Sequence, residues 1–79
     1  MSDLETERGH LAKADSDLAD GERRITAQML LIEQLRADGR DTVEAERLLL
    51  TLRQTLDAWW GHRDLIVQAI TRLEHAPPH

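Results

Sequence analysis

The clearest helical pattern in the chain lies in residues 45–73, which read AERLLLTLRQTLDAWWGHRDLIVQAITRL. Apolar residues recur there in alternating steps of four and three, with one polar interruption at Arg63. Such spacing is typical of a helix that packs along a seam against another helix. Leu48 and Trp60 flank the seam on either side, so the apolar face is wider than one partner helix can cover. The seam positions are Ala45, Leu49, Leu52, Leu56, Trp59, Arg63, Ile66, Ile70 and Leu73.

A weaker seam precedes this stretch. An apolar residue recurs every seven positions, which again predicts a long helix with a coiled-coil-like seam. The second row of that seam is small or polar except at its end. The first row is Leu4, Leu11, Leu18, Ile25 and Ile32, and the second is Glu7, Ala14, Gly21, Gln28 and Leu35.

A short connection separates the two segments. Gly39 suits the left-handed position that ends a helix. Asp41 or Thr42 can cap the next helix, and so short a turn makes two helices antiparallel. We therefore predict an all-α fold: one domain, residues 1–79, forming an antiparallel two-helix hairpin. The predicted helices are 3–37 and 42–75, with a turn at 38–41 and a frayed tail at 76–79. The alternative is three helices, if Gly21 or Gly61 breaks one.

The hairpin register predicts contacts between the helices. With the turn near Gly39, Gly21 is level with Ala58 and Trp59, so that a glycine makes room for an indole. Arg63 needs a carboxylate partner, because an unpaired buried charge is costly. We expect this arginine to fix the register through a salt bridge with Asp15, Asp17 or Asp20.

The apolar face left over by one hairpin predicts self-association. Monomers rarely expose so large an apolar surface, and two hairpins can close into a homodimeric four-helix bundle. Coverage by a different protein is the alternative. Trp59 is predicted in the core, and Trp60 at the dimer interface, in a partner-binding hot spot or in partly exposed packing. The predicted interface is Leu48, Leu52, Leu56, Trp59, Trp60, Ile66, Val67 and Ile70.

Charge and composition exclude several classes. The chain has 79 residues and a formal charge of −5, and all of that excess lies in residues 1–22. Nucleic-acid or membrane binding needs clustered Lys and Arg, so both are unfavourable there. Five arginines toward the turn keep nucleic-acid binding as a third possibility: Arg23, Arg24, Arg36, Arg40 and Arg47. The chain has no cysteine, no stretch long enough to span a membrane and no basic leader, so we expect a cytoplasmic protein.

No motif in the chain predicts catalysis or a cofactor. Residues 15–26 depart from a calcium loop at three ligand or glycine positions. His10 and His62 lie far apart in the hairpin, and Pro77 and Pro78 prevent a helical pair of His75 with His79. Neither serine has a histidine and a carboxylate placed to activate it. We therefore expect no enzyme, no metal and no cofactor.

From His10 to about Leu73 the chain resembles a set of uncharacterised short helical-hairpin proteins of rhizobia-like alphaproteobacteria. The residues that carry this resemblance are His10-Leu11-Ala12, Gly21-Glu22-Arg23-Arg24-Ile25, Asp38-Gly39-Arg40-Asp41-Thr42 and His62-Arg63-Asp64. It implies a cytoplasmic bacterial protein shaped as a hairpin, and it brings no functional residues with it.

The sequence thus predicts a small protein–protein interaction module, an adaptor or regulator that acts as a homodimeric bundle. Two alternatives remain: a bundle that binds a small ligand or a metal, and an acidic, antitoxin-like inhibitor of a basic protein.

Overall fold

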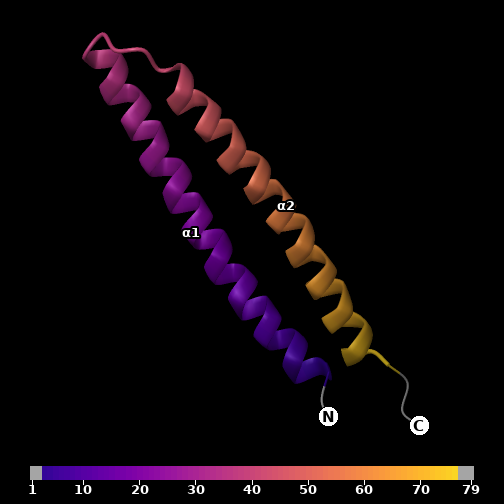
Figure 1. Ribbon diagram of the computed structural model, residues 1–79. Coiled ribbons are helices and arrows are strands. Elements are labelled where there is room, and N and C mark those ends of the chain that lie inside the picture. The colour runs from indigo at the N-terminus through magenta and orange to yellow at the C-terminus, as the bar shows by residue number, and fades with distance from the viewer. Residues whose placement is uncertain (1–2, 77–79) are drawn as a thin grey trace.

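The computed structural model describes residues 3–76, and they form two long helices (Figure 1). Helix α1 spans Asp3–Ala37 and helix α2 spans Val43–Glu74. The helices lie antiparallel and in contact along their length, with both chain ends at one end of a rod of 67 × 15 × 15 Å. The described residues contain no strand. The all-α, two-helix prediction is confirmed.

The helix bounds agree closely with those predicted. Helix α1 has its predicted limits, whereas α2 begins one residue later and ends one residue earlier than 42–75. Both helices run without a break through Gly21 and Gly61, so the three-helix alternative is wrong. The tail prediction for residues 77–79 lies outside the described residues.

The turn is closed by hydrogen bonds around Gly39, which has φ = 68°. The Gly39 N–H donates to the Arg36 carbonyl at 3.0 Å, and the Arg40 N–H donates to the Leu35 carbonyl at 2.8 Å. This pair of bonds is the Schellman motif, in which the residue after the helix adopts a left-handed conformation. Glycine adopts that conformation without a steric penalty, so Gly39 ends α1 as predicted.

The start of α2 uses one of the two predicted caps. The Asp41 carboxylate accepts a hydrogen bond from the Val43 N–H at 3.0 Å, whereas the Thr42 side chain makes no capping bond. A carboxylate at this place also interacts favourably with the positive end of the helix dipole. Together with the turn at Gly39, this cap sets the reversal of the chain.

The core is a thin seam between the helices. In the described residues the buried set is small: Ala14, Leu18, Gln28, Ile32 and Ile66. Gln28 satisfies its buried amide by donating from Nε2 to the Ala45 carbonyl at 2.8 Å. A buried amide without a partner would be costly, so this bond holds the turn half of the seam at a defined register.

The register differs slightly from the predicted one at Gly21. A Cβ placed on Gly21 would lie 3.0 Å from Leu56 Cδ1, so Leu56 faces this glycine in place of Trp59. The side chain of Trp59 is 41% exposed, and its predicted place in the core is wrong for the single hairpin. The physical reason is the small size of the facing residues of α1, because Ala14 and Gly21 have too little side chain to cover an indole.

Neither helix, within the described residues, combines the length and the apolar character that crossing a membrane requires.

Candidate interaction surface

One side of the hairpin is closed by contacts between charged side chains. At the open end of the hairpin Arg8 Nη2 lies 3.0 Å from Glu74 Oε2, and near the turn Arg36 Nη2 lies 2.6 Å from Glu46 Oε1. Between these two ion pairs Arg53 Nη2 approaches Met29 Sδ at 3.8 Å. We call this side, defined by Arg8, Met29, Arg36, Glu46, Arg53 and Glu74, the bridged face.

Arg63 adds a third interhelical ion pair on this side. Its Nε donates to Asp15 Oδ1 at 2.6 Å, and its guanidinium carbon lies 5.7 Å from the ring centroid of Trp60. A guanidinium over an indole face is a favourable cation–π arrangement. Arg63 is therefore held between a carboxylate of α1 and an aromatic ring of its own helix, and Trp60 belongs to the bridged face.

Of the three carboxylates predicted as partners of Arg63, the structure brings only Asp15 to it. Asp17 pairs with Lys13, one turn earlier, with Lys13 Nζ 3.0 Å from Asp17 Oδ2. Asp20 pairs with Arg23. These local pairs take up part of the negative charge that the sequence concentrates in residues 1–22.

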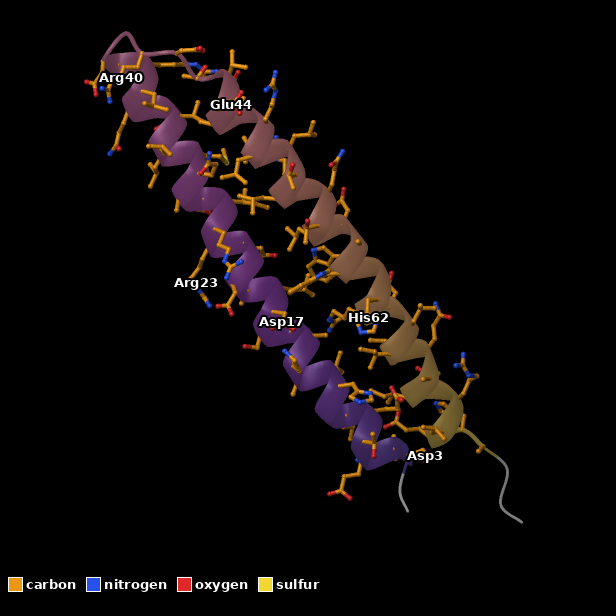
Figure 2. All side chains as sticks on the ribbon, viewed as in Figure 1. Asp3, Asp17, Arg23, Arg40, Glu44 and His62 are labelled. Carbon is orange, nitrogen blue, oxygen red and sulfur yellow. The ribbon has the colours of Figure 1, made fainter. Side chains whose placement is uncertain are left out.

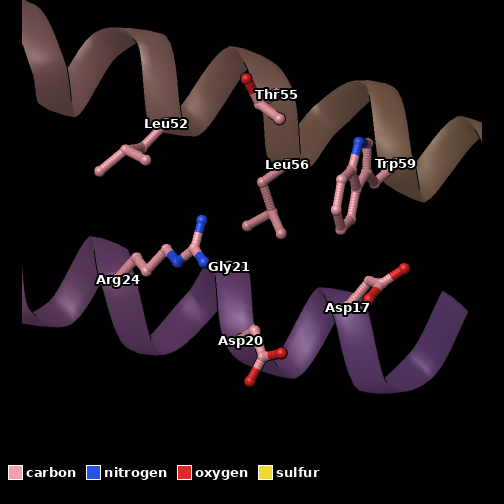
Figure 3. Close-up of a pocket in the computed structure, with 8 residues that line it drawn as sticks. All are labelled: Asp17, Asp20, Gly21, Arg24, Leu52, Thr55, Leu56 and Trp59. Carbon is pink, nitrogen blue, oxygen red and sulfur yellow. The ribbon is translucent and has the colours of Figure 1, made fainter. Parts of the chain in front are cut away.

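The opposite side of the seam is hollowed. Figure 3 shows one indentation there, with Gly21 and Leu56 at its floor and Trp59 at one end. Its rim is polar and includes Asp17, Asp20, Arg24 and Thr55. Further hollows along the same side are lined by Asp17 together with His62, which Figure 2 labels on facing parts of the two helices. We call this side, defined by Asp17, Arg24, Thr55, Trp59 and His62, the open face.

None of the residues with which helix α2 lines the open face is Asp, Glu, Lys or Arg. They recur in steps of three and four beside the core seam, and all are exposed except the half-buried Ala69. Leu48 is 49% exposed and Leu65 is 63% exposed. We call this set the α2 stripe: Leu48, Thr51, Thr55, Ala58, His62, Leu65 and Ala69.

Helix α1 contributes charges to the same face. Arg24 lies at the rim of the hollow and makes no ion pair with any described residue, whereas Asp17 is held by Lys13. The open face thus combines an uncharged stripe of α2 with acidic and basic groups of α1, among which Asp17 and Arg24 lie about two turns apart.

The predicted interface residues divide among three places. Ile66 is buried in the hairpin's own seam, and Leu52, Leu56, Val67 and Ile70 are half-buried along it. Trp60 lies on the bridged face, whereas Leu48 and Trp59 lie on the open face.

Sequence reasoning found part of the α2 stripe. The sequence places Leu48, Thr55, His62 and Ala69 on one flank of the seam and leaves Leu65 uncovered by one hairpin, whereas Thr51 and Ala58 were given no interface role. The signal that could have found them is the distribution of charge beside the seam, because the positions flanking the seam on the bridged side of α2 include Glu46, Arg53 and Glu74. Hydrophobic periodicity alone ranks Thr and Ala too low to reveal such a surface.

Among residues 3–76 no three or more His, Asp or Glu side chains gather as a metal site would require. Comparisons with protein-family models, with curated proteins and with solved structures give no match to the chain. The candidate site is therefore defined by surface chemistry: a partly apolar face between two helices.

Proposed function

We propose that the chain is a small protein–protein interaction module that self-associates into a four-helix bundle and serves as an adaptor or regulator without catalysis. The observation that supports this proposal is the incomplete core of the single hairpin. Large apolar side chains remain exposed on it, with Trp59, Trp60, Leu48 and Leu65 each between 41% and 63% exposed. Burying such side chains is the main favourable term in protein association.

The size of the chain supports the same conclusion. Small domains bury a smaller fraction of their surface than large ones, and many of them gain stability by oligomerising. Two helices provide only one shared seam, whereas four helices enclose a core on several sides. A second hairpin is the simplest source of the missing helices, because a homodimer needs no other gene product.

Sedimentation equilibrium on the full chain tests the proposal directly. We expect a mass twice that of the 9.0 kDa chain at micromolar concentration. Because association stabilises the folded state by mass action, the melting temperature should also rise with protein concentration. A monomer whose melting temperature does not depend on concentration would overturn the proposal.

A further inference from the structure

We propose that the open face is the surface through which two copies associate, with a two-fold axis that crosses the helices near Ala58. In this arrangement α2 of one copy lies antiparallel on α2 of the second copy, and α1 lies antiparallel on α1. This inference rests on the self-association proposed above and names the surface that it uses.

The first argument is the distribution of charge around α2. The bridged side of this helix carries Glu46, Arg53 and Glu74, and all three contact side chains of α1. None of the seven residues of the α2 stripe, which runs from Leu48 to Ala69, is Asp, Glu, Lys or Arg. Charged residues are depleted at the centre of protein interfaces, because their desolvation is costly. Of the two sides of α2, the one on the open face therefore costs less to bury.

The second argument is size complementarity within the α2 stripe. A two-fold axis near Ala58 places Leu48 opposite Ala69 of the second copy, and Leu65 opposite Thr51 of the second copy. His62 likewise lies opposite Thr55. Each larger side chain thus meets a small one, and the small Ala58 lies at the axis, where the two helices approach most closely. Alternation of large and small side chains lets facing helices interdigitate.

The third argument comes from α1, at the same level of the hairpin. An axis that crosses α1 midway between Asp17 and Arg24 places Asp17 opposite Arg24 of the second copy, and the reverse. Arg24 has no ion-pair partner among the described residues and lies at the rim of the open-face hollow. Two symmetry-related ion pairs would supply that partner, and complementary charges fix the register of an interface.

The other closed two-fold arrangement is less favourable. An axis parallel to the helices would lay α1 of one copy on α2 of the second copy. Asp17 would then lie level with His62 of the second copy, whereas Arg24 would lie level with Thr55, which offers no counter-charge. Partly buried charges without partners oppose association, so the perpendicular axis is favoured.

The available area suits a stable dimer. The stripe spans 22 residues of α2, which is about 33 Å of helix, and two helices side by side present a width of about 20 Å. The footprint is therefore on the order of 700 Å² on each copy, which approaches the ~800 Å² per partner of a standard interface.

Cysteine cross-linking tests the position of the axis, since the chain has no cysteine of its own. We expect Ala58→Cys to form a covalent dimer on mild oxidation or with a short bis-maleimide, because the two thiols lie on either side of the axis. Asp57→Cys is the matched control, an adjacent exposed position that points away from the open face. Equal cross-linking of the two variants would overturn the inference.

A charge exchange tests the register of α1. We expect Arg24→Asp and Asp17→Arg each to weaken dimerisation by about 10-fold, since each turns two attractive pairs into two repulsive ones. The double variant should return to within about 3-fold of the unmodified chain. Arg40→Asp, which makes the same charge change at the exposed turn, should have little effect. If the double variant is weaker than either single variant, the proposed register is wrong.

The outcomes separate this inference from the proposed function. A monomeric wild-type chain would overturn both. A dimer in which Ala58→Cys does not cross-link and Trp60→Ala lowers the association constant by more than 10-fold would place the interface on the bridged face. That result would overturn the open-face inference and leave self-association standing.

Discussion

The two faces of the hairpin differ in the contacts that join α1 to α2. On the bridged face, Arg8–Glu74, Arg36–Glu46 and Arg63–Asp15 join the helices at both ends and near the middle. On the open face, Gly21 leaves a hollow, and α2 presents the uncharged α2 stripe. Overall hydrophobicity therefore does not identify the free side of such a hairpin. Apolar residues are exposed on both faces, whereas interhelical charge pairs gather on one.

The largest expected effect comes from a charge placed within the α2 stripe of the open face. Leu65→Glu should weaken dimerisation by about 100-fold, because it buries a carboxylate without a partner. Since Leu65 is 63% exposed in the single hairpin, the substitution should leave the helices intact. Sedimentation equilibrium measures the association constant, and circular dichroism measures the helix content.

Leu50→Glu is the matched control for that experiment. Leu50 is 58% exposed and points away from both the seam and the open face. We expect the same chemical change there to alter the association constant by less than about 3-fold, the ordinary effect of a surface substitution. Equal losses in the two variants would show that the faces do not differ as described.

The comparison also shows how far the sequence predicts this molecule. Heptad spacing predicts both helices, and the properties of glycine and aspartate predict the turn at Gly39 and the cap at Asp41. The predicted core position of Trp59 is wrong, because the spacing of apolar residues along one helix does not reveal the size of the side chains that face them from the other helix. Opposite Trp59, the small side chains of Ala14 and Gly21 leave the indole uncovered. The open face is formed by residues of both helices, so the pattern of one helix alone does not predict it.

A second, smaller effect compares Gly21, at the floor of the open-face hollow, with Gly61, which faces no neighbour. Gly61→Ala should raise the free energy of unfolding by about 1 kcal/mol, because alanine favours a helix and nothing lies within 4 Å of the new Cβ. Gly21→Ala should gain less, since its Cβ would lie 3.0 Å from Leu56 Cδ1 and Leu56 must shift. Urea unfolding followed by circular dichroism compares the two variants. Equal gains would mean that the close approach of Leu56 to Gly21 places no constraint on the seam.

The smallest expected effect distinguishes the ion pairs of the bridged face from one another. A double-mutant cycle of Arg63→Gln and Asp15→Asn should give a coupling energy of about 1 kcal/mol, the upper end of the range for exposed pairs. Arg63 has 29% of its side chain exposed and also contacts Trp60, so its guanidinium is partly ordered before it pairs.

The same cycle on Arg8 and Glu74 should give less than about 0.5 kcal/mol, because these side chains are 59% and 44% exposed at the open end of the hairpin. A larger coupling at the end than in the middle would refute the role of Arg63 in holding the register. It would also mean that the bridged face is held at its end, and that the contact of Arg63 with Trp60 adds little order. Because exposed pairs are screened by salt, repeating both cycles at high ionic strength should reduce the Arg8–Glu74 coupling by the larger fraction.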